Sequence, residues 1–219
     1  MGRMRISPLW WFVILLAAIL LLTAFGPAEK SLGANVRVVY LHGVWVWTAL
    51  AGFLAAAVAG LAGLVSRRQA LHMWSRALGR TGLFFWVTYL PISMWAMQAN
   101  WNGLYLAEPR WRIGLIFAIG GLLMQIGLTL VENAAWASAC NAIYALVLRL
   151  ALGSTEQVMH PDSPIWGSDA WRIQLYFASL FALTLLAAWQ LARWWHRLEI
   201  TPQASSQKPR SIRTSETGN

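Results

Sequence analysis

Apolar residues are gathered into six long segments along the chain, and most polar residues lie in the short stretches between them. A helix that crosses the hydrocarbon core of a bilayer needs about 20 mostly apolar residues. The pattern therefore predicts six transmembrane helices, at residues 9–25, 38–65, 82–99, 113–131, 134–152 and 171–195. The expected fold is an all-α polytopic membrane protein, with its six helices in one bundle over residues 1–200.

The two terminal segments are interpreted separately. The first apolar segment follows Arg3 and Arg5, as in a signal peptide. It is long for that role, and residues 26–28 form a poor cleavage site, so we expect a retained helix. Residues 201–219 are rich in Ser, Thr, Gln and Pro without an apolar period, which predicts a disordered cytoplasmic tail.

Composition supports the membrane assignment. Hydrophobic residues make up 58% of the chain and charged residues only 11%, whereas a soluble domain carries about 25% charged residues. The net charge of +9 does not indicate nucleic-acid binding, because the basic residues lie between apolar segments, where membrane topology explains them. The single cysteine, Cys140, excludes an intramolecular disulfide and any CxxC motif, so we interpret it as a packing residue.

The distribution of basic residues predicts the orientation, because cytoplasmic loops of membrane proteins carry an excess of Lys and Arg. With both termini in the cytoplasm, 11 of the 17 basic residues lie on the inner side, namely Arg3, Arg5, Arg67, Arg68, Arg76, Arg80, Arg193, Arg197, Lys208, Arg210 and Arg213. We therefore expect a multi-pass protein of the cell inner (plasma) membrane with both termini cytoplasmic.

This orientation places two of the four histidines on the outer side. His42 lies at the outer end of the second predicted helix, and His160 lies in the loop before the sixth. Imidazole is a common ligand of metals and haem iron, so two loops from different helices could supply two axial ligands. The alternative is that both are solvated loop residues. His72 and His196 lie beside arginines on the inner side, where we expect interfacial cations.

Tryptophan gathers near both predicted membrane boundaries. The inner group fits an aromatic belt at headgroup depth. The outer group is larger and extends into loops; it consists of Trp45, Trp47, Trp95, Trp101, Trp111, Trp166 and Trp171. Indole faces also offer a broad apolar surface to a flat conjugated ligand, so the outer group is either a belt or a ligand platform.

Residues 100–112 join the third and fourth predicted helices on the outer side and combine aromatic residues with a carboxylate and two guanidinium groups. Pro109 disfavours helix just before it and suits a first helical turn, so we expect the fourth helix to begin near it. Arg110 and Arg112 could bind carboxylates such as haem propionates, or could pair with Glu108 or with lipid phosphate.

These features together resemble the cytochrome c assembly proteins, a haem-handling family with a tryptophan-rich periplasmic loop, and most closely its cytochrome c maturation branch. Residues 36–42 (Val-Arg-Val-Val-Tyr-Leu-His) resemble the first histidine motif, and Met159-His160-Pro161 resembles the second. Residues 101–112 stand in the place of the tryptophan-rich loop, although two leucines occupy positions where the family has tryptophan. The resemblance covers residues 36–193.

The resemblance implies a protein without enzymatic activity that holds haem at the outer membrane face. It implies delivery of the haem to a periplasmic haem-acceptor protein during cytochrome c biogenesis, next to subunits of an ABC-type transporter. His42 and His160 would be the axial ligands of the haem iron. The other implied cofactor-binding residues are Trp101, Tyr105 and Trp111, as part of the haem platform, and Glu108 and Arg110, which would orient the loop or meet the propionates.

The residues alone leave three other functions open. A transporter or transporter subunit would place ionisable residues at mid-membrane depth. The deepest polar residues of the fourth and fifth predicted helices are Gln125 and Asn141, which helix–helix hydrogen bonding explains equally well. An assembly subunit without haem would tolerate replacement of His42 and His160. A cytochrome with haem inside the bundle would need facing histidines within the helices.

Overall fold

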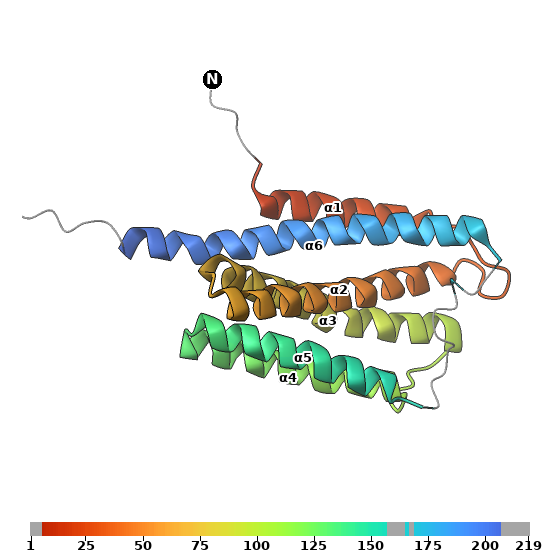
Figure 1. The fold of residues 1–219 in the computed structure, drawn as a ribbon. Helices are drawn as coiled ribbons and strands as arrows, with labels where there is room; N and C mark the ends of the chain where they lie inside the picture. Colours follow the sequence, from red (N-terminus) through yellow and green to blue (C-terminus); the bar gives the residue numbers. More distant parts are fainter. Residues whose placement is uncertain (1–5, 157–164, 167–168, 207–219) are drawn as a thin grey trace, which may run out of the picture.

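The computed structural model describes residues 6–156, 165–166 and 169–206 of the 219-residue chain. It consists of six α-helices joined by loops (Figure 1). The helices are α1 (Pro8–Ala24), α2 (Val36–Ser66), α3 (Gln69–Trp101), α4 (Pro109–Val131), α5 (Ala134–Gly153) and α6 (Trp171–Ser206). The predicted all-α fold with six helices is therefore confirmed.

The sequence predicts some helix boundaries better than others. α4 begins at Pro109, as expected from the position of this proline. α3 begins at Gln69, well before the predicted start at residue 82. Only Arg67 and Arg68 separate it from the end of α2. Its first turns carry charged side chains, which the apolar pattern assigns to a loop. α6 also continues past residue 200, to Ser206.

Four helices are long and apolar enough to cross a membrane: α2, α4, α5 and the Trp171–Ile200 part of α6. α1 is apolar but has only 17 residues, and α3 is longer but more polar. Since a span needs about 20 mostly apolar residues, the chain has the helices of a membrane protein, and a lipid bilayer is the medium that suits its exposed apolar side chains.

The helices are arranged in three pairs (Figure 1). α2 and α3 form the central antiparallel pair, α1 lies along α6 on one side, and α4 lies beside α5 on the other. The central pair approaches closely at glycines, because a Cβ atom on Gly52 would lie only 2.9 Å from the Cα of Gly82. Small residues let helix backbones approach in this way inside membranes.

Polar side chains inside the bundle bond to one another across helices. The ring of His72 is 2.7 Å from Ser138 Oγ, and His72 is only 6% exposed. The expectation that His72 lies at the membrane interface is therefore wrong, because α2 and α5 cover it. Asn141 donates to the carbonyl of Ser75 at 3.0 Å, and Gln125 donates to Asn141 Oδ1 at 3.1 Å. The predicted helix–helix hydrogen bonding of Gln125 and Asn141 is confirmed.

The ends of the helices define two ends of the bundle. The starts of α2, α4 and α6 lie together with the ends of α1, α3 and α5 (Figure 1). We call this the outer end, after the orientation predicted from the basic residues, and the opposite one the inner end. Every predicted site residue that the structure describes lies at or next to the outer end.

Candidate functional site

His42 lies on the second turn of α2 and is half-buried. Its ring centroid is 5.9 Å from that of Tyr89 on α3, and the two ring planes are tilted by 55°. The next residue, Gly43, faces α6, where a Cβ atom would lie 3.1 Å from the ring of Phe177. α3 and α6 therefore hold α2 from two sides at the level of the imidazole.

Hydrogen bonds fix the start of α2 against the end of α3. The side-chain amide of Asn35 donates to the carbonyl of Ala99 at 2.8 Å, and that of Asn100 donates to the carbonyl of Asn35 at 3.4 Å. The segment that carries His42 is thereby tied to the segment 100–112. These are the first two of the three segments on which the predicted site depends.

The loop before α2 is held by its own polar contacts. Arg37 Nε donates to the carbonyl of Gly26 at 2.9 Å. The carboxylate of Glu29 accepts hydrogen bonds from the hydroxyl of Ser31 and from the backbone N–H groups of Ser31 and Leu32. These bonds, the hydroxyl bond above all, lower the pKa of Glu29 below its usual value, because they stabilise the charged form.

The aromatic residues after α3 form a small exposed group. Trp101 is the last residue of α3, and its ring lies edge-on to that of Tyr105, with centroids 5.8 Å apart. Tyr105 is 46% exposed, and the neighbouring Leu104 and Leu106 are similarly exposed. A short segment held at one end by α3 thus presents aromatic and aliphatic surface at the outer end.

Glu108 positions the start of α4. It is the N-cap residue, and its Oε2 accepts a hydrogen bond from the backbone N–H of Trp111. Such a bond satisfies one of the free N–H groups at a helix start, and the negative charge suits the positive end of the helix dipole. Glu108 is only 6% exposed, so it orients the loop from within. Arg110 and Trp111, on the first turn of α4, are half-buried.

Tyr89, which the sequence did not single out as a site residue, lies between His42 and α4. Tyr89 is 4% exposed and places its hydroxyl where a Cβ atom would stand on Gly114, at 1.4 Å from that position. Trp86 supports the contact, since its indole N–H donates to the carbonyl of Gly114 at 3.1 Å. The available signal was the aromatic spacing of Trp86 and Tyr89 on one face of α3, opposite a glycine of the next helix.

The described residues of the predicted site bring three kinds of side chain to the outer end of the bundle. His42 supplies an imidazole, residues 101–106 supply exposed apolar surface, and α4 supplies guanidinium groups. The indole N–H of Trp111 is buried without a hydrogen-bond partner in the described part of the chain, which suits a carboxylate acceptor. The second predicted ligand, His160, lies outside the described residues. Within residues 6–156, 165–166 and 169–206, no three His, Cys, Asp or Glu side chains form a metal-binding group.

The inner end is organised differently. Glu199 on α6 forms ion pairs with two arginines of α3. Its Oε1 is 3.5 Å from Arg76 Nε and 3.0 Å from Arg80 Nη1. The ring of Trp74 is stacked between those of Trp189 and His196, with centroid distances of 5.0 and 4.1 Å. His196, expected to be an interfacial cation, is therefore part of an aromatic stack between α3 and α6.

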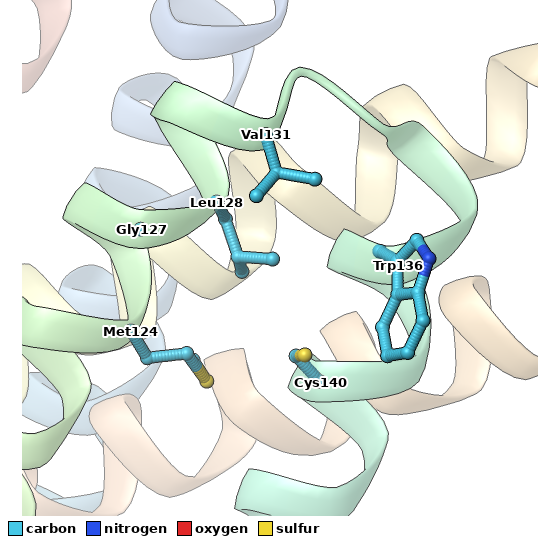
Figure 2. Close-up of a pocket in the computed structure, with 6 residues that line it drawn as sticks. All are labelled: Met124, Gly127, Leu128, Val131, Trp136 and Cys140. Atoms are coloured by element: carbon cyan, nitrogen blue, oxygen red, sulfur yellow. The ribbon is translucent and has the colours of Figure 1, made fainter.

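A cavity of about 390 Å3 lies between α4 and α5 towards the inner end (Figure 2). The residues that line it are Met124, Gly127, Leu128, Val131, Trp136 and Cys140. Its walls are apolar, as the close-up shows. It lies at the end of α4 and the start of α5, whereas His42 lies near the start of α2. It offers neither an imidazole nor a carboxylate, so its chemistry is that of a lipid-facing gap between two loosely packed helices.

Comparison with known proteins adds no identification to this geometry. No protein-family model matches the chain, and no curated protein sequence matches it either.

Proposed function

We propose that this chain is a six-span membrane protein that holds haem at its outer end and delivers it to a periplasmic acceptor during cytochrome c biogenesis. The observation that carries the proposal is the pair of hydrogen bonds from Asn35 and Asn100. They join the segment of His42 to the segment 100–112, which are the two described segments whose sequences resemble haem-handling motifs. The chain itself makes and breaks no substrate bond in this role.

Each group at the outer end has a defined part in the proposal. Bound haem would supply an iron that accepts imidazole ligands and propionate groups that accept hydrogen bonds. His42 offers one imidazole, and His160 is the proposed second ligand. The half-buried Trp101 and the exposed Tyr105 offer apolar faces. Arg110 and the N–H of Trp111 offer donors to carboxylates, since guanidinium groups bind carboxylates in a bidentate manner.

The proposal also places α1 and α3 in the membrane and both termini in the cytoplasm. The charges of α3 support this placement, because Arg76 and Arg80 are paired with Glu199 at the inner end and do not face lipid as isolated cations. Charged residues inside membranes are tolerated when they pair with one another or lie near helix ends. The same arginines contribute to the excess of basic residues on the inner side.

An absorption spectrum of the detergent-purified protein supplied with haem tests the ligands. We expect a Soret band that is lost or shifted in His42→Ala and in His160→Ala. The matched control is His196→Ala, which removes an imidazole stacked at the inner end and should leave the band unchanged. A wild-type protein without a Soret band, or a band that both outer variants keep, would leave a transporter or assembly subunit without haem as the better function.

Labelling with a membrane-impermeant maleimide tests the spans. In a Cys140→Ser background, Leu106→Cys should react in intact spheroplasts, whereas Arg68→Cys should react only after permeabilisation. The two positions flank α3, and both are exposed. Labelling of both from the same side would contradict a membrane-spanning α3.

A further inference from the structure

A second cavity, between the start of α1 and the last turns of α6, differs in chemistry from the apolar gap beside α5. Its volume is about 260 Å3, and the residues that line it are Ile6, Pro8, Trp11, Gln190, Arg193 and Arg197. Among the residues that the structure describes, the lining contains two guanidinium groups and no carboxylate. The volume is smaller than the roughly 300–1,000 Å3 of sites for drug-sized ligands, so it suits a small anionic group.

The two arginines are arranged on one side of α6. Arg193 and Arg197 are one helical turn apart, and like charges at this spacing repel each other. Gln190, one turn earlier, accepts a hydrogen bond from Arg193 Nη1 at 3.2 Å, which helps to fix that guanidinium beside the cavity. The neighbouring carboxylate of Glu199 is engaged by two arginines of α3. The cavity wall on α6 therefore presents the guanidinium groups of Arg193 and Arg197.

The opposite wall is apolar and aromatic. Ile6 and Trp11, before and within the first turn of α1, are 51% and 44% exposed. Tryptophan is enriched where a membrane helix meets the headgroup region, and the rest of α1 is apolar. A basic wall and an apolar wall thus meet at the end of a hydrophobic helix.

We propose that the cavity binds the phosphate group of an anionic phospholipid. Guanidinium groups bind phosphate through two parallel hydrogen bonds, and basic pockets between membrane helices bind anionic headgroups. Free phosphate shares this chemistry, but the exposed Ile6 and Trp11 favour a ligand with an apolar portion. The inference rests on the membrane location of α1 and α6 and does not depend on haem binding.

Native mass spectrometry of the full chain in detergent tests the proposal, with phosphatidylglycerol, phosphatidylcholine and inorganic phosphate as separate probes. Arg193→Gln/Arg197→Gln should lower the affinity for the first phosphatidylglycerol by about tenfold or more. The matched control is Arg67→Gln/Arg68→Gln, which removes two exposed charges from the same end, outside the cavity, and should keep the affinity. Phosphatidylcholine should bind more weakly to the wild type.

A third variant separates loss of the site from loss of the fold. Arg193→Lys/Arg197→Lys keeps both charges and should recover binding, with a helical circular dichroism spectrum in all variants. Equal losses in the two glutamine variants would indicate unspecific charge attraction and overturn the proposal. Undiminished lipid binding by Arg193→Gln/Arg197→Gln would also overturn the proposal. The same holds if Arg193→Lys/Arg197→Lys binds the lipid no better than the glutamine variant. Displacement of the lipid by an equal concentration of inorganic phosphate would overturn the assignment to a phospholipid.

Discussion

The inner and outer ends of the bundle use their polar and aromatic side chains in different ways. At the inner end, Arg76 and Arg80 pair with Glu199, and Trp74 is stacked between two rings of α6. At the outer end, Tyr105 and its neighbours stay about half exposed, although the carbonyl of Tyr105 accepts a hydrogen bond from Glu108 N–H and that of Leu106 accepts one from Arg112 Nε. Exposed residues held by a rigid scaffold are typical of binding sites.

The described histidines show the same difference. His72 is hydrogen-bonded inside the bundle, and His196 is stacked on Trp74 between α3 and α6. Both have contacts that explain their presence through packing. His42 lies on the second turn of α2, towards the outer end, in contact with Tyr89. The comparison teaches that position in the bundle, and not residue type, separates a structural imidazole from a candidate ligand.

The largest effect is expected at the tightest contact of the outer end. Gly114→Ala would place a Cβ atom 1.4 Å from the hydroxyl of Tyr89, and overpacking of this kind should lower the free energy of unfolding by about 3 kcal/mol. Thermal unfolding in detergent measures the change. The matched control is Gly120→Ala on the same helix, where a Cβ atom meets nothing within 4 Å. Equal stability of the two variants would contradict the α3–α4 contact.

The next effect tests the ion pairs of the inner end. Glu199 is only slightly exposed, and Glu199→Gln leaves two guanidinium groups without their carboxylate. Because the arginines are partly exposed, water screens the interaction, and we expect a loss of about 1–2 kcal/mol in the free energy of unfolding. Haem binding should not change. Glu132→Gln, at an exposed turn, is the control, and a similar loss there would refute a specific role for Glu199.

A smaller effect should show whether Asn35 positions the His42 segment for haem binding or only stabilises the fold. Asn35→Ala removes the bond to the carbonyl of Ala99, and an exposed hydrogen bond of this type is worth about 0.5–1 kcal/mol. We expect a measurable fall in haem affinity in spectroscopic titrations, because the His42 segment loses one of its two hydrogen bonds to the end of α3 and keeps only the one from Asn100. The control is Gln98→Ala, at the exposed residue of α3 directly before Ala99, which should leave the affinity unchanged.

The smallest effect concerns the loop before α2 and depends on pH. The folded state holds the pKa of Glu29 below its usual value, chiefly through the hydroxyl of Ser31. Its contribution to stability is therefore present above the unfolded-state pKa and disappears as the pH falls through the lower, folded-state pKa. Wild type and Glu29→Gln should differ slightly near pH 7 and converge as the pH falls below the folded-state pKa of Glu29.

Local sequence determined the helices that a bilayer requires. Apolar runs of about 20 residues can satisfy their backbone only as helices in lipid, and the observed bounds of α1, α2, α4 and α5 lie within a few residues of those predicted. Pro109 marked the start of α4 because proline suits a first helical turn. The two neighbouring segments of the candidate site, around His42 and residues 101–111, were also recognisable by residue type.

Only the tertiary structure decided which polar residues are buried. The first turns of α3 read as a loop because they contain Arg76 and Arg80, yet they are helical and packed, since their carboxylate partner stands far along the chain in α6. Likewise His72 is covered only when α5 brings Ser138 to it, and Gly114 is irreplaceable only because Tyr89 fills the space beside it. Such partners are set by helix packing, so no local pattern could predict them.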